Sequence, residues 1–499
     1  MSGTTELRGE LSIVVLGASG DLAKKKTFPS LLRLFERDAL PKNTSIFGYA
    51  RTKMEQNEFH ERISPNLKGS REDSQKKFLD ICSYVPGAYD EAEAFQNLTK
   101  QIEKTEKERG GDSHNRIFYL ALPPNVFASV SAQLKENCYS KSGVNRIVIE
   151  KPFGKDLDSC QELIDGMKKL WSEQDTFRID HYLGKEMVKN ILPFRFSNPA
   201  VDMSLNKDRV ESVEIAFKEP FGTEGRGGYF DEFGIIRDIQ QNHLCQVFCL
   251  LAMETPESFS AEDIRDQKVK LLKATKPIST DEVLLGQYTA ANQKPGYKDD
   301  DTVPKDSNTP TFAALVLHVD NERWKGVPFI IKAGKALDEG SVDIRVQYKP
   351  VKNPMVDNAK RNELVMRIQP DEAIYMKCNT KAPGHNSISV PVELDLTYSS
   401  RFEDAYIPEA YEALILDCIQ GKHSNFVRDD ELLASWSIFT PLLHAIDQGK
   451  VPCSTYPYGS RGPEKLDEFL NKFQYHHDKQ YEWPKTNIAK YVEKVEKHP

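Results

Sequence analysis

The segment Leu11-Ser-Ile-Val-Val-Leu-Gly-Ala-Ser-Gly-Asp-Leu-Ala23 decides the fold. Its first six residues form a short, mostly β-branched run, which is typical of a central parallel strand. The run leads directly into a glycine-rich turn, and a helical pattern over 22–35 follows, interrupted by Pro29. This order predicts a nucleotide site, because backbone N–H groups at the start of such a helix hold a pyrophosphate. The spacing Gly-x-x-Gly-x-x-Ala departs from Gly-x-Gly-x-x-Gly, so an ordinary turn is the alternative.

The end of the next predicted strand, Ser45–Tyr49, indicates which cofactor binds. NAD sites place an acid there for the ribose hydroxyls, whereas NADP sites place a cation for the 2′-phosphate. The sequence after the strand contains Arg51 and no acid before Glu55. Arg51 therefore predicts NADP, and the alternative is an exposed loop arginine.

Further alternation of strands and helices predicts a doubly wound parallel sheet. Strands are expected at Arg116–Leu122 and Arg146–Ile149, with a helix beginning at Val126 between them. The second of these strands ends in Glu150-Lys-Pro-Phe-Gly154. Lys151 is thus expected in the crevice at the carboxyl ends of the strands, although a solvated lysine is equally compatible. Pro152 restricts Lys151 and is a candidate for a cis bond.

The segment Arg178–Asn190 concentrates polar groups at one point of the chain. If a helix begins near Asp180, then His181 and Lys185 share one face of it. Together with Tyr182 they offer nitrogen donors and a phenol, which suit a phosphate or another anion. The alternative is an N-cap aspartate followed by partly exposed rings.

The second half of the chain predicts a larger domain with a mainly antiparallel sheet. Short strands, several of them alternating, are expected at Val210–Phe217, Thr311–Val319, Phe329–Lys332, Val342–Tyr348, Glu363–Ile368, Ala373–Lys377 and Glu393–Leu396. Helices are expected at Gly234–Glu254, Glu409–Leu416 and Asp429–Ile446. The fold class is therefore a Rossmann-like α/β domain at 1–177 followed by an α+β domain at 178–499. One face of the large sheet is free to meet a second subunit, so an oligomer is expected.

The predicted helix Gly234–Glu254 carries one apolar stripe that a histidine interrupts. Ile236, Ile239, His243 and Val247 recur at spacings of three and four. His243 is either a satisfied core histidine or a general base in a water-poor site, for which its near-neutral pKa suits it. A base needs an orienting acid, and Asp180 is the candidate. Asp238 lies on another face and suits a ligand hydroxyl.

Composition excludes several classes of protein. The 499 residues carry a net charge of −8, which disfavours nucleic-acid binding. Residues 1–10 lack the apolar core of a secretory signal, and no apolar run approaches the about 18 residues of a membrane helix. The eight cysteines form no Cys-x-x-Cys pair, and Cys245 and Cys249 are read as buried thiols. A cytoplasmic protein without metal ligands or membrane association is expected, and its tail after Pro484 is expected to be poorly ordered.

Five stretches together resemble the glucose-6-phosphate dehydrogenase family. They are Gly17-Ala-Ser-Gly-Asp-Leu-Ala23, Glu150-Lys-Pro-Phe-Gly154, Arg178-Ile-Asp-His-Tyr-Leu-Gly-Lys-Glu186, Lys218-Glu-Pro-Phe-Gly-Thr-Glu-Gly-Arg-Gly-Gly-Tyr-Phe230 and Tyr458-Gly-Ser-Arg-Gly-Pro463. The similarity runs from about Leu11 to about Trp483, and the segment at 178–186 is highly specific to the family. The resemblance implies oxidation of glucose 6-phosphate at C1 to 6-phosphoglucono-1,5-lactone with hydride transfer to NADP, the first step of the oxidative pentose phosphate pathway.

The resemblance also implies roles for individual residues. His243 takes the C1 hydroxyl proton, and Asp180 fixes and stabilises its imidazole. The substrate phosphate is held by His181, Tyr182 and Lys185, and the sugar is oriented by Lys151, Glu219, Asp238, Lys335 and Gln369. The cofactor is held by Gly17, Ala18, Ser19, Gly20, Asp21, Leu22 and Arg51, with Lys151 near the nicotinamide. Homodimers or homotetramers are implied.

Eukaryotic members of the family carry a second, structural NADP in the sheet domain. Residues matching that site are Lys332, Arg345, Arg367, Tyr375, Lys377, Asp395, Thr397, Arg461, Tyr475 and Trp483. Gly340 and Ser341 stand where family members often have basic residues, one for the substrate phosphate and one for this second NADP. Weaker binding of the structural cofactor is therefore an open alternative.

Two other functions compete with this interpretation. A sugar dehydrogenase of the glucose–fructose oxidoreductase type also pairs a Rossmann domain with Glu-Lys-Pro and a later histidine, but it needs no phosphate site. A non-catalytic NADP sensor on the same fold would not need His243. Activity on unphosphorylated glucose would favour the first, and an output unaffected by His243→Asn would favour the second.

Overall fold

A computed structural model describes residues 6–110, 113–351, 359–381 and 389–477. The chain divides into two compact units. Unit 1 comprises residues 1–189, 254–269 and 407–436, and unit 2 comprises 190–253, 270–406 and 437–499. The two units are described separately. The domain boundary expected after residue 177 stays a prediction.

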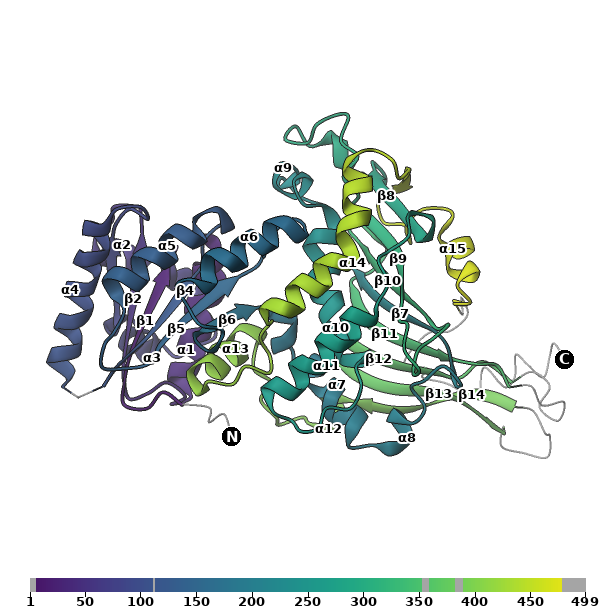
Figure 1. The fold of residues 1–499 in the computed structure, drawn as a ribbon, viewed down its shortest axis with the longest axis horizontal. Helices are drawn as coiled ribbons and strands as arrows, with labels where there is room; N and C mark the ends of the chain where they lie inside the picture. The colour runs from purple at the N-terminus through teal and green to yellow at the C-terminus, as the bar shows by residue number, and fades with distance from the viewer. Residues whose placement is uncertain (1–5, 111–112, 352–358, 382–388, 478–499) are drawn as a thin grey trace. The chain divides into compact units, whose positions relative to one another are not determined.

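Unit 1 is built on a parallel sheet, as the sequence predicted, and this sheet has six strands (Figure 1). The strand order is β3-β2-β1-β4-β5-β6, so the order reverses between β1 and β4, where doubly wound sheets bind their ligands. The strands are β1 Glu10–Leu16, β2 Asn43–Ala50, β3 Cys82–Pro86, β4 His114–Leu120, β5 Asn145–Glu150 and β6 Thr176–Ile179. β3 was not predicted, because it has only five residues and lies within a charged, helix-rich stretch.

Helices cover both faces of this sheet (Figure 1). The α-helices are α1 Phe28–Glu36, α2 Gln56–Ile63, α3 Glu72–Asp80, α4 Ala92–Arg109, α5 Phe127–Gln133, α6 Leu157–Lys168 and α13 Ala410–Gln420. Shorter 3₁₀ or π turns are η1 Ala23–Thr27, η2 Ser64–Asn66, η3 Pro124–Val126, η4 Leu134–Cys138, η5 Glu173–Asp175 and η6 His181–Gly184.

Helix α13 enters the core of unit 1 from a distant part of the sequence. Its Leu414, Ile415, Cys418 and Ile419 are buried in one cluster with apolar residues of α1 and the sheet strands. Burial of this apolar face explains why a segment some 230 residues after β6 folds with it.

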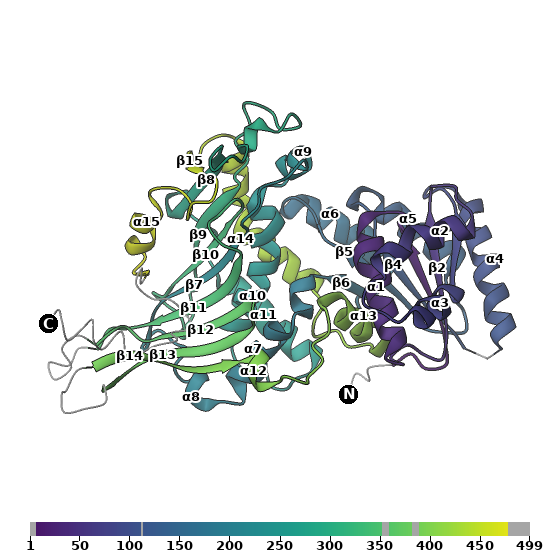
Figure 2. The same ribbon diagram turned by 180° about the vertical axis from the view of Figure 1, so that it is seen from behind.

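Unit 2 contains a nine-stranded, mainly antiparallel sheet, again as predicted. The order is β14-β13-β12-β11-β7-β10-β9-β8-β15. Among the described strands of this sheet, only β7–β10 and β8–β15 pair in parallel. The strands are β7 Val210–Lys218, β8 Val283–Thr289, β9 Phe312–His318, β10 Pro328–Gly334, β11 Ser341–Tyr348, β12 Glu363–Gln369, β13 Ala373–Lys381, β14 Ser389–Thr397 and β15 Cys453–Pro457. Figure 2 shows strands β11 to β14 from the face opposite helix α10.

The long helix predicted over 234–254 forms as a π-helical segment, η7 Ile236–Leu244, followed directly by α10 Cys245–Ala252. It packs on β7 and β10, and the buried Gln240 amide donates to the carbonyl oxygens of Ala313 (2.9 Å) and Ile331 (3.0 Å). Smaller helices are α8 Pro199–Asp202, α9 Gly227–Asp231, α12 Tyr398–Arg401, α15 Leu466–Lys472, η8 Thr280–Glu282 and η9 Tyr297–Asp299. Three of the borders between the units fall within α7 Glu186–Phe196, α11 Ala261–Ala274 and α14 Asp429–Asp447, and two follow Met253 and Tyr406.

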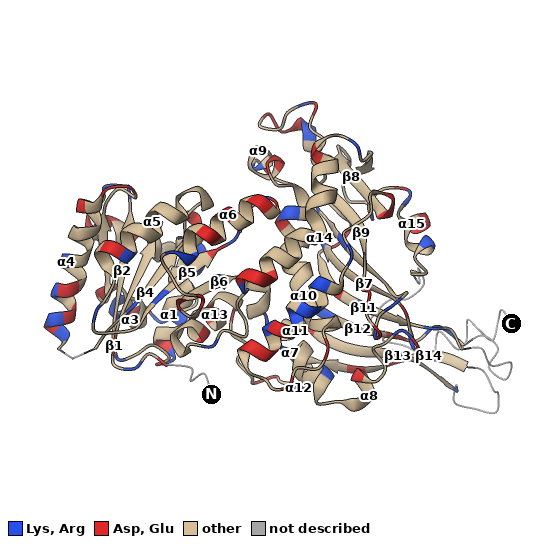
Figure 3. Cartoon of the chain, in the orientation of Figure 1, with Lys and Arg blue, Asp and Glu red and all other residues tan. Residues whose placement is uncertain are grey.

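The charged surface is mixed in sign. Along α4, lysine and arginine alternate with glutamate (Figure 3), as expected of a solvated charged helix. Within the described residues, every helix is too short or too polar to cross a membrane.

Candidate active site

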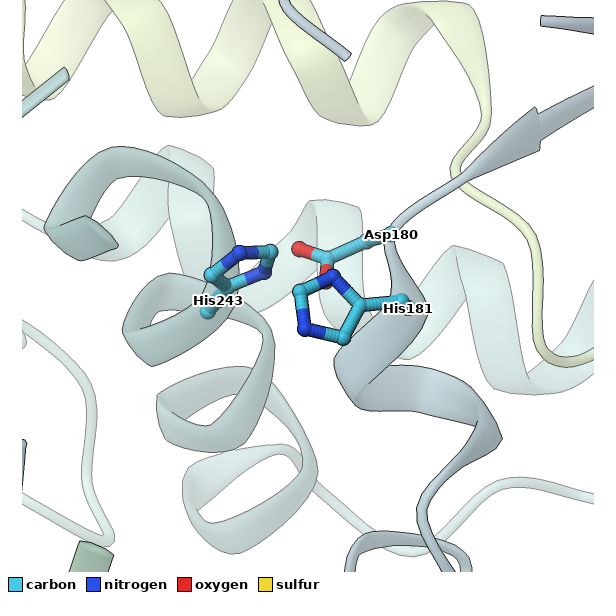
Figure 4. Close-up of side chains that lie close together, drawn as sticks. All are labelled: Asp180, His181 and His243. Atoms are coloured by element: carbon cyan, nitrogen blue, oxygen red, sulfur yellow. The ribbon is translucent and has the colours of Figure 1, made fainter. Parts of the chain in front are cut away.

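Asp180 connects β6 to the turn that follows it (Figure 4). Its backbone is extended, and its Oδ1 accepts a hydrogen bond from the Tyr182 N–H at 3.0 Å, so it caps η6 as predicted. The side chain is only 2% exposed. Burial raises the pKa of Asp180, against the opposing effect of His181 beside it.

The turn after Asp180 differs from the helix that the sequence predicted. The 3₁₀ turn ends at Gly184, Lys185 is extended, and α7 begins only at Glu186. The expectation that His181 and Lys185 share one helical face was therefore wrong. They still lie in one short segment, where the ammonium of Lys185 is 5.1 Å from the centre of the Tyr182 ring.

Gly184 is required by a close approach of two backbones. A Cβ at this position would lie 2.3 Å from the carbonyl oxygen of Ala410, directly at the start of α13. The same helix places the Tyr411 ring parallel to the His181 ring, with centres 5.8 Å apart and planes at 9°. No local pattern predicts this contact, because α13 follows β6 only after more than 200 residues.

Lys151 and Asp180 leave the sheet at the same edge. Glu150 and Ile179, the last residues of β5 and β6, are register partners, so the residues that follow them begin side by side. The Lys151–Pro152 bond is cis, which agrees with the possibility raised for Pro152. Lys151 is half-buried at the carboxyl end of its strand, where it was predicted.

The glycine-rich turn after β1 has the geometry of a dinucleotide cradle. Gly17 has φ +84°, and a Cβ there would lie 2.2 Å from the Ala121 carbonyl oxygen, so only glycine fits. The N–H groups of Gly17 and Ala18 donate to the carbonyl oxygen of Tyr49 at 2.8 and 3.2 Å, which ties the turn to the end of β2. The first N–H groups of the helix after the turn have no acceptor within the helix and can meet a pyrophosphate.

Arg51 is exposed just beyond β2, and its guanidinium lies 5.5 Å from the centre of the Tyr89 ring. Arg62 at the end of α2 also reaches the glycine-rich turn, where it donates to the Ser19 carbonyl oxygen at 3.3 Å. The Thr52 hydroxyl donates to the Ser19 hydroxyl at 3.3 Å. These donors around the turn suit an anionic nucleotide. Arg62, and Tyr89 beside Arg51, were not identified from the sequence, because no motif contains them.

His243 lies on η7 in unit 2 (Figure 4) and is 1% exposed. The apolar stripe predicted around it is confirmed, since Ile236, Ile239, Val247 and Leu250 are all buried. The backbone N–H of His243 donates to the Asn242 side-chain oxygen at 2.7 Å. The imidazole is thus shielded from bulk water, which is compatible both with a core histidine and with a general base in a water-poor site.

Three sugar-binding candidates lie at one edge of the sheet of unit 2. Lys335 and Glu219 follow the paired strand ends Gly334 and Lys218, and their side chains form an ion pair of 2.5 Å. Gln369 ends β12 opposite Val342, which in turn pairs with Phe217 of β7. Asp238 is half-buried on η7.

The residues matched to a second cofactor line a charged pocket of about 520 Å³ in unit 2. Seven of the ten predicted residues line it, namely Lys332, Arg345, Arg367, Tyr375, Lys377, Arg461 and Tyr475. Its walls carry eight lysines and arginines against five aspartates and glutamates, so the pocket is net cationic.

Several of these cations already face acids. Lys332 meets Glu214 at 2.6 Å, and Lys377 meets Glu363 at 2.6 Å. Burial alone would raise the pKa of Glu214, but Lys332 lowers it to about 2. Asp395 and Thr397 lie together on β14, with the Thr397 hydroxyl donating to Asp395 at 2.9 Å, and do not line the pocket. Trp483 lies outside the described residues. Gly340 is exposed, and Ser341 is buried at the start of β11.

Comparison with known proteins relates both units to one family. Residues 14–190 match the family model "Glucose-6-phosphate dehydrogenase, NAD binding domain", and residues 192–483 match "Glucose-6-phosphate dehydrogenase, C-terminal domain". The chain belongs to the glucose-6-phosphate dehydrogenase family.

Relatives within the glucose-6-phosphate dehydrogenase family match almost the whole chain. Glucose-6-phosphate 1-dehydrogenase of Emericella nidulans is 55% identical over 97% of this chain and 96% of its own length. Glucose-6-phosphate 1-dehydrogenase 6, cytoplasmic, of Arabidopsis thaliana is 53% identical over 95% of this chain and 93% of its own length. A solved glucose-6-phosphate dehydrogenase in complex with its substrate glucose 6-phosphate is 51% identical, with a TM-score of 0.92 over 95% of this chain and all of that chain. These findings do not favour the glucose–fructose oxidoreductase type.

Proposed function

We infer that the protein is an NADP-dependent glucose-6-phosphate dehydrogenase that oxidises the C1 hydroxyl of glucose 6-phosphate to 6-phosphoglucono-1,5-lactone. The observation that carries this conclusion is the buried turn at Asp180–Lys185, in a chain that matches full-length members of the family. The reaction begins the oxidative branch of the pentose phosphate pathway. The cytoplasm is the proposed location, in line with the cytoplasmic relative.

His181, Tyr182 and Lys185 are the proposed ligands of the substrate phosphate. His181 and Tyr182 lie in the turn η6 and Lys185 directly follows it, and the three supply an imidazole, a phenol and an ammonium. Charge-assisted hydrogen bonds to phosphate oxygens are the strong ones, so this set distinguishes a sugar phosphate from a free sugar. The burial of Tyr182 and the capped backbone hold the donors in place.

His243 is the proposed general base, with Asp180 as the acid that orients it. An imidazole nitrogen of His243 takes the C1 hydroxyl proton while the C1–H bond breaks and a C1=O bond forms. NADP, when bound, supplies the acceptor for the hydride that leaves C1. The carboxylate of Asp180 selects the imidazole tautomer and stabilises the imidazolium that forms.

The sugar hydroxyls are the proposed partners of Lys151, Glu219, Asp238, Lys335 and Gln369. The ion pair of Lys335 with Glu219 fixes both groups at the sheet edge, so each presents its remaining hydrogen-bonding capacity in a set direction. Lys151 follows β5 at the edge of the parallel sheet, which suits a group that serves both sugar and nicotinamide.

The proposed NADP site comprises Gly17 to Leu22 and Arg51. The glycine-rich turn supplies backbone donors for the pyrophosphate, and Arg51 supplies the cation for the 2′-phosphate. The charged pocket of unit 2 is the proposed site of a second, structural NADP, held through its cationic walls. Acidic partners on Lys332 and Lys377, together with Gly340 and Ser341, favour weaker binding there. The proposed assembly is a homodimer or homotetramer.

The test follows reduced cofactor in an assay that pairs two sugars with two cofactors. Glucose 6-phosphate with NADP should give the highest kcat/KM, with a large loss for free glucose and a loss for NAD. Equal activity on glucose and glucose 6-phosphate would contradict the proposal, because the phosphate site would then have no effect.

A further inference from the structure

A fully buried carboxyl group lies directly behind Lys151. Glu150 ends β5 and is 4% exposed. The Tyr119 hydroxyl on β4 donates to it at 2.5 Å, and the Tyr411 hydroxyl of α13 lies within hydrogen-bonding reach of it. Burial raises the pKa of Glu150 to about 7, against the opposing effects of Tyr119, Lys151 and Tyr411. None of the steps described above uses this carboxyl.

Tyr411 connects Glu150 with the turn that follows Asp180. Its hydroxyl lies within hydrogen-bonding reach of Glu150, and its ring lies nearly parallel to the ring of His181, with centres 5.8 Å apart. A phenol held at its hydroxyl and packed on its face has little freedom to rotate. The orientation of the His181 imidazole is therefore coupled to Glu150 through Tyr411.

We propose that Glu150 is a positioning residue for sugar-phosphate binding, which holds the Tyr411 ring against which His181 stacks. The proposal rests on the proposed role of His181 as a ligand of the substrate phosphate. It adds a carboxyl to the active site that touches neither substrate nor cofactor.

The charge of Glu150 decides how firmly it holds Tyr411. The groups that face it are Tyr119, Tyr411, Lys151 and Asp180. Burial raises the pKa of both tyrosines, so both stay protonated donors near neutrality. Above pH 7 the carboxylate accepts from both phenols. Below pH 7 the protonated carboxyl has one O–H donor and is an uncharged, weaker acceptor, so its hydrogen bonds with the two phenols weaken.

Steady-state kinetics of wild type and Glu150→Gln from pH 6.3 to 8.5 test this role of Glu150. Glutamine has nearly the same shape as glutamate, but only its amide oxygen accepts hydrogen bonds, because its amide nitrogen is a donor. At pH 8.3 we expect the KM for glucose 6-phosphate to rise about three- to tenfold. The kcat and the KM for NADP should stay within about twofold. The ratio of the KM for glucose 6-phosphate in Glu150→Gln to that in wild type should fall towards one below pH 7. Titration of the substrate and of His181 cancels in this ratio, because both enzymes contain them.

Thermal unfolding separates positioning from a purely structural role. A carboxyl with a raised pKa costs folded-state stability as pH rises from about 4.5 through about 7, since the folded protein prefers its protonated form. Glu150→Gln should therefore have a Tm at pH 8.3 equal to or above that of wild type, although its substrate affinity is lower. Glu106→Gln is the matched control. Glu106 is a buried carboxylate bonded to Arg116 and Ser12, and its variant should lose Tm without a change in KM.

Tyr411→Phe keeps the ring but removes the bonded hydroxyl, so it should reproduce the rise in KM. The double variant with Glu150→Gln should be no worse than either single variant, because both break the same connection. An unchanged KM at pH 8.3 in Glu150→Gln, an equal loss at all pH values, or additive losses would overturn the role of Glu150. A wild-type protein inactive on glucose 6-phosphate would instead overturn the proposed function and this role with it.

Discussion

Asp180 caps a helical turn and is also the proposed partner of His243. The cap uses one carboxylate oxygen, Oδ1, on the Tyr182 N–H. Capping fixes the direction of the side chain, and burial strengthens any charge interaction that its other oxygen makes. Asp180 can therefore cap the turn and also serve as the proposed partner of His243, because the cap fixes the direction of its carboxylate.

Removal of the proposed base should affect turnover more than binding. His243→Asn should lower kcat by about 10²–10⁴, the usual contribution of a general base, with little change in the KM for glucose 6-phosphate. Steady-state kinetics at saturating NADP measures both constants. His318→Asn, which alters a histidine paired with Glu282, is the control and should keep wild-type kcat. A drop of less than fivefold in His243→Asn would contradict the assignment.

Arg51 should select between the two nicotinamide cofactors. Arg51→Ala removes the partner of the 2′-phosphate and should raise the KM for NADP by about tenfold or more, since charge-assisted bonds contribute about 1.5–3 kcal/mol. The KM for NAD, which lacks that phosphate, should change little. Arg71→Ala, at an exposed arginine before α3, should leave both values unchanged. Equal losses for NADP and NAD would show that Arg51 does not read the 2′-phosphate.

Lys185 should recognise the phosphate of the sugar. Lys185→Ala should raise the KM for glucose 6-phosphate by about tenfold or more and leave any turnover of free glucose nearly unchanged. Lys169→Ala, at an exposed lysine after α6, should behave as wild type. Parallel losses on both sugars would remove Lys185 from the phosphate site.

The residues that the sequence could predict are those next to a strand end or on a periodic stripe. Arg51, Lys151 and His243 belong to this group, because their surroundings follow from local pattern. Tyr89 and Tyr411, which contact Arg51 and His181, could not be predicted, because each lies in a segment whose own pattern gives no indication of that contact.

At the scale of elements, the contact between η6 and α13 depends on one missing side chain. Gly184→Ala would place a Cβ 2.3 Å from the Ala410 carbonyl oxygen and should destabilise the protein by about 1–3 kcal/mol. Gly166→Ala, within α6, is the matched control. Among the described residues its Cβ would meet only Ala128 of α5, at 3.9 Å. It should be neutral or stabilise by about 0.5–1 kcal/mol. Thermal unfolding measures both, and an equal Tm for the two variants would contradict the account of Gly184.

Predictability of the elements follows the strength of their local signal. The strand–turn–helix at 11–36 and the histidine-bearing helix were predicted, since β-branched runs and a three–four stripe are unambiguous. Strands β8 and β15 were not, because Gly286 interrupts the first and the second has five residues that end in Pro457. The sequence analysis considered a helix beginning near Asp180, because the spacing of the polar residues suits one, but the chain forms a 3₁₀ turn that ends at Gly184.

At the scale of the whole molecule, the chain combines a parallel sheet that cradles a nucleotide with a large sheet whose edge carries Glu219, Lys335 and Gln369. Family members match both parts over nearly their full length. We propose that this combination transfers hydride from C1 of glucose 6-phosphate to NADP.

Isotope transfer tests that claim most directly. Glucose 6-phosphate deuterated at C1 is incubated with the protein and NADP, and the reduced cofactor is isolated and analysed by mass spectrometry. We expect one deuterium in each molecule of reduced NADP, together with an equal amount of 6-phosphogluconolactone or its hydrolysis product. Deuterium that stays in the sugar or passes into water, or the absence of NADP reduction, would contradict it.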